Sequence, residues 1–313
     1  MDSFVISLIN GAVYGLLLFL VAAGLTLVFG MMGILNFAHA SFYMVGAYAA
    51  YALSSVIGFW GGLLIGPIVV ALIGLVVERY LLRPVHKYGH ASELLVTFGL
   101  AFVFQELIKA VFGQFLINYA IPDSLRFSAF TVFGTPYPFY RIFVALVAIA
   151  LFVALIALLR FTRMGIVVRA AVQRPEMVGA LGHNVSAVFM LTFGIGAWMA
   201  GIAGAVGGAL LTTSPNMALE MAILAFVVVI VGGLGSLTGA FFACLIIGLL
   251  TTFAVSINVS LADIGRSIGL GDTLAALGTV ATLKLSTYAG AMPVLVMLLV
   301  LLIRPSGLLG ERK

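Results

Sequence analysis

Long apolar runs are the feature of this 313-residue chain that most restricts its fold. A helix needs roughly 20 apolar residues to cross a bilayer. Runs that approach or exceed this length cover 4–30, 35–57, 61–82, 93–113, 141–160, 187–211, 219–255 and 286–303. The chain is 64% hydrophobic and 8% charged, with a mean hydropathy of +1.28, whereas soluble domains are about 25% charged. We therefore predict that residues 1–313 form a single transmembrane domain of an integral membrane protein.

One of these runs, 219–255, is too long for a single crossing and is interrupted by the stretch "GGLGSLTG" at 232–239. Glycine weakens a helix and permits close backbone approach, so Gly232, Gly233 and Gly235 are candidates for a helix break or hinge. The run then forms two shorter passes, which gives about nine segments, and a weakly amphipathic half-helix is expected around 262–282. The predicted fold is an all-α, polytopic helical bundle with roughly eight to ten segments, some broken or half-length.

The distribution of lysine and arginine predicts the orientation of the chain. Basic residues cluster after the third, fifth and last runs, and positively charged loops remain in the cytoplasm. Counting back from the first cluster places the N-terminus outside and the C-terminus inside. The residues that decide this are Arg79, Arg83, Lys87, Arg160, Arg163, Arg169, Arg174, Arg304, Arg312 and Lys313.

Several function classes find no support in the sequence. The chain contains no G-x-x-x-x-G-K-[ST] phosphate-binding motif and no Ser-His-Asp or Cys-His pair in a recognisable context. Because Cys244 is its single cysteine, an internal disulfide is excluded. His86 and His90 in "HKYGH" make a poor metal site, since a closed site needs three or four ligands, and we expect a solvated loop. We expect no catalytic residues, metal, cofactor, nucleic-acid partner or cleaved leader.

A cluster of polar residues, "NFAHAS", interrupts apolar sequence between the first two segments. Asn36, His39 and Ser41 carry hydrogen-bonding side chains that lipid cannot satisfy, and polar groups at membrane depth usually face the bundle interior or a water-filled cavity. They are candidates to line a translocation path. Equally, they could close a turn or bond free backbone groups inside the bundle. A weak similarity between "NFAHASFYMVGAY" and "NMALEMAILAF" at Asn216 is compatible with two related halves.

The connection 160–186 contains a predicted helix too short to cross the membrane. Pro175 suits the first helical turn, Glu176 suits the positive end, and Gly182 can terminate the helix. Met177, Val178 and Leu181 form an apolar stripe, and Arg169 and Arg174 flank the helix. A short amphipathic helix on the cytoplasmic side either lies on anionic lipid headgroups or docks into a groove of a partner protein.

Four stretches of the chain together resemble a known family. They are "GLTLVFGMMGILNFAHASFYMVGAY", "RAAVQRPEMVGALGHNV", "GGLGSLTGAF" and "LLIRPSGLLG". In this order, over nearly the whole chain, they resemble the LivH-type permeases of bacterial branched-chain amino-acid ABC importers, a group that includes urea, amide and other organic-acid systems. The resemblance implies an inner-membrane permease for a small polar solute, most simply branched-chain or related amino acids.

The same resemblance implies partners and a coupling element. The partners are a second, LivM-type permease, two cytoplasmic ATPases that hydrolyse the ATP, and a periplasmic solute-binding protein, with membrane lipid around them. The 174–184 helix resembles the coupling helix that sits in a cleft of the ATPase. The coupling candidates are Arg174, Glu176, Met177, Ala180, Leu181, Gly182 and Asn184.

Two alternatives stay open at this point. A stand-alone secondary transporter or channel would be expected to keep a mid-span carboxylate for ion coupling, but Glu78, Glu93 and Glu106 lie near segment ends. We expect Glu106 and Lys109, at i and i+3, to form a structural ion pair. A membrane enzyme would need a catalytic constellation, which the sequence lacks. The solute itself is not specified by this sequence.

Overall fold

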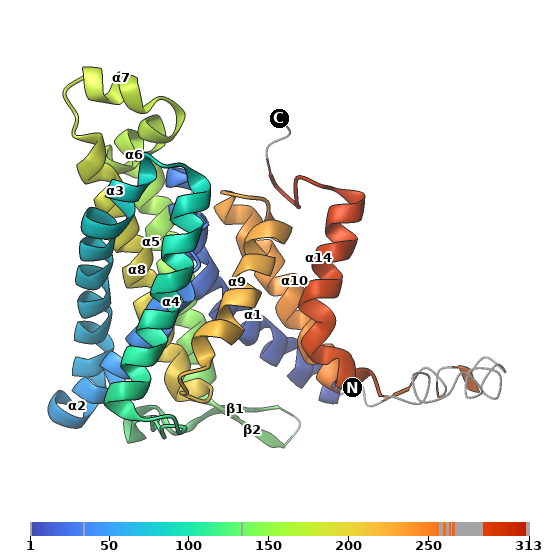
Figure 1. Ribbon diagram of the computed structural model, residues 1–313. Coiled ribbons are helices and arrows are strands. Elements are labelled where there is room, and N and C mark those ends of the chain that lie inside the picture. The colour runs from blue at the N-terminus through green and yellow to red at the C-terminus, as the bar shows by residue number, and fades with distance from the viewer. Residues whose placement is uncertain are drawn as a thin grey trace.

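A bundle of long helices is built around the N-terminal helix (Figure 1). The computed structural model describes residues 2–33, 35–132, 134–256, 259–260, 263, 265–266 and 284–310. The helices are α1 (Asp2–Met32), α2 (His39–Val77), α3 (Arg83–His86), α4 (His90–Phe112), α5 (Phe139–Phe161), α6 (Arg163–Gln173), α7 (Pro175–Ala180), α8 (Val185–Leu210), α9 (Met217–Gly232), α10 (Leu237–Ser256) and α14 (Met292–Ile303).

Short elements connect the helices. A π-helical turn (Glu78–Leu82) joins α2 to α3, and 3₁₀ turns occupy Asp123–Leu125 and Leu285–Ala291. Strands β1 (Ser128–Val132) and β2 (Thr135–Pro138) pair antiparallel in the connection before α5. Of the predicted half-helix around 262–282, all but residues 263, 265 and 266 lies outside the described residues.

Within the described residues, seven helical segments are long and apolar enough to cross a membrane, and α9 is a shorter apolar helix. One of the seven, His39–His86, is folded back on itself at Gly58, whose φ of 76° and ψ of 167° break the helix. A Cβ added at Gly66 would lie 3.0 Å from the amide nitrogen of Ala50, although sixteen residues of straight helix span about 24 Å. Counting the two arms of α2 separately and adding α9 gives the nine predicted segments. The polytopic all-α fold is confirmed.

The core surrounds α1, which packs against α5, α8, α9 and α10. Its middle is fully enclosed: Leu17, Phe19 and Leu20 are all 0% exposed. Small residues let neighbouring backbones approach, as expected for membrane helices. One very close approach joins α8 to α2, where a Cβ on Gly204 would overlap the carbonyl oxygen of Tyr43.

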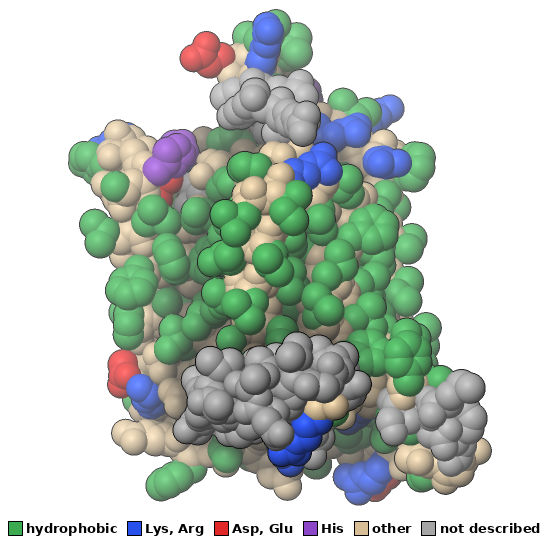
Figure 2. All heavy atoms as spheres, turned by 90° about the vertical axis from the view of Figure 1, so that its right-hand side faces the viewer, with side chains coloured by type: hydrophobic (Ala, Val, Ile, Leu, Met, Phe, Trp, Pro, Cys, Tyr) green, Lys and Arg blue, Asp and Glu red, His purple; other side chains and the backbone are tan. Residues whose placement is uncertain are grey.

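The bundle has two ends with different elements. Helices α6 and α7 project from one end, which we call the α7 face, and the β1–β2 hairpin covers the other, which we call the hairpin face (Figure 1). The N-terminus lies at the hairpin face and the C-terminus at the α7 face. Figure 2 shows a belt of apolar side chains between two rims where charged side chains gather. This arrangement fits a bilayer that surrounds the belt.

We expect the substitution Gly204→Ala to destabilise the protein, because the added methyl group meets backbone rather than a movable side chain. Overpacking typically costs about 1–3 kcal/mol, so the melting temperature of the purified protein in detergent should fall by several degrees. The matched control is Gly99→Ala in α4, where a Cβ would meet nothing within 4 Å. An equal loss of stability in both variants would contradict the close packing of α2 and α8.

Candidate functional site

The chain re-enters the bundle between α1 and α2. The Phe37 amide donates to the hydroxyl oxygen of Thr97 at 3.3 Å, and Thr97 lies within α4, two turns from its start. Asn36 accepts a 3.0 Å hydrogen bond from the Ala38 amide, which closes the turn before α2. Helix α2 therefore begins inside the bundle and not at its surface.

His39, the first residue of α2, is held against the middle of α1. One of its ring nitrogens lies 3.1 Å from the carbonyl oxygen of Val21. A Cβ on Gly24 would lie 2.9 Å from the ring, so glycine at this position makes room for the histidine.

The three residues predicted to avoid lipid are all enclosed by protein. Asn36, His39 and Ser41 are each 1% exposed. Asn36 Nδ2 and His39 Nδ1 find no hydrogen-bond partner among the described residues. None of the three is among the residues that line the two cavities described below. They close the turn before α2 or lie buried beside it, and their place on a translocation path stays a prediction.

Helix α9 starts in the same way as α2. The Met217 amide donates to the carbonyl of Ser214, as the His39 amide donates to Asn36, and the Glu220 amide donates to Asn216, as the Phe42 amide donates to Ala38. The caps Ala38 and Asn216 have nearly the same backbone angles. In this pattern Asn216 corresponds to Ala38 and Ser214 corresponds to Asn36, so the backbone repeat is displaced by two residues from the sequence similarity between Asn36 and Asn216.

The start of α9 lies beside α4, away from the hairpin face. The side chain of Gln105 in α4 donates to Asn216 at 3.1 Å. At 1.5 Å per residue, Gln105 is about 10 Å from the hairpin-face end of α4 and about 22 Å from its other end. The first turn of α9 is therefore at membrane depth.

A cavity of about 550 Å³ opens beside this first turn. Helices α1, α2, α8 and α9 and the α8–α9 connection contribute to its wall. The wall combines one carboxylate and three hydroxyls with apolar side chains. The lining residues are Tyr14, Tyr43, Leu210, Leu211, Thr212, Met217, Glu220, Met221 and Leu224.

Glu220 is the residue that the sequence reasoning missed. It is exposed in the isolated chain, beside Leu219 at 65% and Ile223 at 52% exposure. A carboxylate near a helix N-terminus gains about 0.3–1 kcal/mol, whereas an acidic residue in mid-membrane costs about 2.5–3.5 kcal/mol. The helix dipole alone does not offset that cost. The sequence shows it as a single Glu in the apolar run 219–255, and the prediction on ion coupling considered only Glu78, Glu93 and Glu106.

The glycine turn at the α7 face connects α9 to α10. Gly233 and Gly235 have φ angles of 100° and 82°, which confirms a break in the long apolar run. The C-terminal segment packs on this turn: the Leu308 and Leu309 amides donate to the carbonyls of Val231 and Gly232. The turn is thereby fastened to the end of the chain, and a hinge role for Gly232, Gly233 and Gly235 stays a prediction.

The connection between α5 and α8 forms two helices. Thr162 caps α6 by accepting from the Gly165 amide at 3.0 Å. Helix α7 ends as predicted at Gly182, with a φ of 84°, and the His183 amide donates to Val178 while the Gly182 amide donates to Gly179. This is the glycine-terminated Schellman pattern. It ends α7 and redirects the chain toward α8.

The outer surface of α7 is exposed and mixed in character. Met177 and Leu181 are 56% and 78% exposed, but Val178 is 4% exposed, so the predicted single apolar stripe divides between an outer and an inner side. Asn184 caps α8 by accepting from the Ala187 amide at 3.0 Å. The coupling candidates that remain exposed on this element are Arg174, Glu176, Met177, Ala180, Leu181, Gly182 and Asn184.

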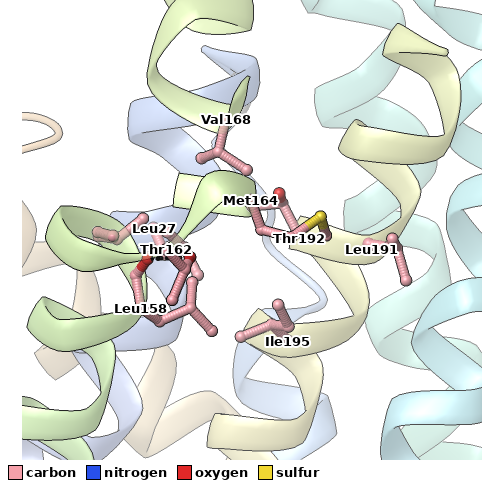
Figure 3. Close-up of a pocket in the computed structure, with 9 residues that line it drawn as sticks. Leu27, Leu158, Thr162, Met164, Val168, Leu191, Thr192 and Ile195 are labelled. Carbon is pink, nitrogen blue, oxygen red and sulfur yellow. Dashed lines mark hydrogen bonds between the residues drawn. The ribbon is translucent and has the colours of Figure 1, made fainter. Parts of the chain in front are cut away.

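Helix α6 rests over a small apolar cavity. Figure 3 shows Val168 of α6 above it, with Leu158 of α5, Leu27 of α1 and Ile195 of α8 around it. The cavity has about 180 Å³. Movement of α6 would therefore be transmitted to three spanning helices through apolar contacts.

The loop "HKYGH" is exposed, as expected, and its two histidines also contact a buried carboxylate. Ring nitrogens of His86 and His90 both contact the carboxylate of Glu93, the latter at 3.2 Å. Glu93 is 1% exposed, and a buried carboxylate requires such partners. The predicted ion pair between Glu106 and Lys109 is confirmed at 2.7 Å.

Comparisons with known proteins agree with this architecture. A family model described as "Branched-chain amino acid transport system / permease component" matches residues 7–303. The LivH high-affinity branched-chain amino acid transport system permease protein of Escherichia coli K12 is 30% identical over 265 residues, which cover 79% of this chain and 84% of that protein. The permease protein BraD of Pseudomonas aeruginosa is 25% identical over 317 residues, and the aligned region covers 97% of this chain and 95% of that protein.

The match to the family model extends over almost the whole chain, and the described helices are those of a multi-pass membrane protein. This chain belongs to the family of permease components of branched-chain amino acid transport systems, and it is a transport subunit of the membrane.

Proposed function

We propose that this chain is the LivH-type permease subunit of a binding-protein-dependent ABC importer that moves branched-chain amino acids into the cytoplasm. The observation that carries the proposal is the exposed α6–α7 element on the basic end of a chain that belongs to this family. The sequence contains no phosphate-binding loop, so ATP binding falls to separate subunits.

The proposed function implies an assembly of this chain with other subunits. Two ATPases dock at the α7 face, which lies in the cytoplasm of a bacterial inner membrane, and the N-terminus is periplasmic. A second, LivM-type permease lies beside this chain, and a periplasmic solute-binding protein delivers the solute at the hairpin face. The basic residues Arg79, Arg83, Arg163 and Arg169 near the α7 face support this orientation.

In this mechanism α7 is the coupling helix. Met177 and Leu181 present apolar contacts, while Arg174 and Glu176 offer charges at the N-terminal end of the helix. Helix-in-groove docking uses such an apolar face with a charged margin. Closure of the ATPases on ATP would move α7, and α6 would transmit the movement to α1, α5 and α8. The permease then alternates between inward-open and outward-open states.

A stand-alone secondary transporter is the second candidate, and one observation favours it. Glu220 places a carboxylate at membrane depth in a cavity, which ion-coupled carriers also require. Family membership and the projecting α6–α7 element favour the importer.

The docking of α7 is tested by combining Glu176→Lys with Leu181→Asp in the co-expressed assembly. We expect the ATPase subunits to dissociate, because the variant reverses one charge and buries another in the groove. The measurement is the amount of ATPase that copurifies with this chain. The matched control combines Asp123→Lys with Phe115→Asp at the hairpin face, where Phe115 is 86% exposed. Undiminished ATPase binding by the α7 variant would refute the coupling assignment.

The role of α6 is tested by Val168→Asp. Val168 is 5% exposed, and an unpaired carboxylate under α6 costs several kcal/mol. We expect ATPase subunits to remain bound while solute uptake per ATP hydrolysed falls about tenfold, measured in proteoliposomes. Ala170→Asp introduces the same charge on the exposed side of α6 and should leave this ratio unchanged. An unaltered ratio in Val168→Asp would exclude transmission through α6.

A further inference from the structure

We propose that the cavity beside α9 is a subsite for the transported amino acid, in which the Glu220 carboxylate binds the ammonium group. This inference rests on the proposed function and adds to it the place in the fold and the side chains that bind the solute. The cavity of about 550 Å³ lies within the roughly 300–1,000 Å³ typical of small-molecule sites.

The groups that line the cavity match the parts of a zwitterionic, aliphatic amino acid. Glu220 supplies the single carboxylate of the wall, and an ammonium group is the cation that such a carboxylate binds by charge-assisted hydrogen bonds. Methionine and leucine side chains, including Met217, Met221 and Leu224, supply apolar surface for the aliphatic chain. Methionine adapts its shape to differently branched chains.

Tyr43 supplies the complementary hydroxyl. Its side chain is 0% exposed and lines the cavity, yet its hydroxyl has no hydrogen-bond partner among the described residues. Buried polar atoms are normally hydrogen-bonded. A hydroxyl can donate to the carboxylate of a bound amino acid, so the Tyr43 hydroxyl is placed to recognise the second charged group of the solute.

The same wall disfavours the other solutes handled by related importers. A dicarboxylate would bring like charge to Glu220, and urea or a simple amide would leave the carboxylate without a counter-charge. The position of the carboxylate adds to this argument. Leu219, Glu220 and Ile223 form one open surface of α9 in the isolated chain. Exposure of a carboxylate to hydrocarbon costs free energy, so this surface borders the solute path and not lipid.

The test compares L-leucine with 4-methylpentanoate, which is leucine without its amino group. Binding of each is measured on the purified permease–ATPase assembly without the solute-binding protein, so that the receptor's own selectivity does not contribute. We expect the wild-type assembly to bind leucine at least tenfold more tightly, in keeping with a hydrogen bond to a charged group. In Glu220→Gln this preference should fall to less than threefold, and Tyr43→Phe should weaken both ligands.

The matched control is Glu106→Gln, which removes an exposed carboxylate of α4 that pairs with Lys109 and does not line the cavity. It should keep the full preference for leucine. Unchanged preference in Glu220→Gln, or no detectable leucine binding to the wild-type assembly at millimolar concentration, would overturn the subsite.

Uptake by the complete importer in proteoliposomes separates this inference from the proposed function. If the wild type takes up leucine with ATP and Glu220→Gln keeps the preference for leucine, the proposed subsite is refuted while the proposed importer function is supported. If this chain alone takes up leucine with a proton gradient and without ATP, the proposed importer function is refuted, and so is the subsite proposal that rests on it.

Discussion

The absence of water at membrane depth is the constraint on which the rest of this structure depends. In hydrocarbon, every backbone amide and carbonyl must be satisfied by the protein, so irregular backbone survives only where protein or a cavity surrounds it. The connection before α2 obeys this rule: Thr97 bonds the Phe37 amide and Asn36 bonds the Ala38 amide. The start of α9 obeys it too, with an amide–carbonyl pattern that repeats that of α2.

Close packing of small residues follows from the same constraint. Lipid chains are as apolar as the helices, so association depends on contact and not on the hydrophobic effect. Helix α8 approaches α2 so closely at Gly204 that a methyl group would not fit. At Gly24 a Cβ would meet the carbonyl oxygen of Gly196 in α8 and also the ring of His39, which bonds the carbonyl of Val21. Glycine thus permits both helix contact and the insertion of a polar ring into the core.

Segment number and helix termination could be predicted because they depend on local sequence. The separation of the apolar runs 35–57 and 61–82 and the glycines at Gly182 and Gly233 are visible without a structure, and the helices break or end there. The turn around Asn36 was also recognisable as a polar interruption. What it contacts was not, because its partners Val21 and Thr97 lie on other helices.

The errors have equally physical causes. Glu220 was missed because the run 219–255 was divided only at its glycines, and a lone carboxylate inside the first half was not weighed against the cost of placing it in a membrane. The loop "HKYGH" is exposed as expected, but the contacts of its histidines with Glu93 were not predicted, because Glu93 is buried in the first turn of the next helix. Val178 was grouped with Met177 and Leu181, but only tertiary packing decides which side of so short a helix faces the bundle.

These contacts connect the α7 face to the cavity at membrane depth through α9. At the α7 face its last turn is bonded by the C-terminal segment through Val231 and Gly232. At its other end Asn216 is bonded by Gln105 of α4, and Glu220 lies one turn further on. Because α9 is one continuous helix from Met217 to Gly232, we expect a displacement of the glycine turn to shift the carboxylate relative to Tyr43. The cavity wall can therefore change its shape without any rearrangement inside α9.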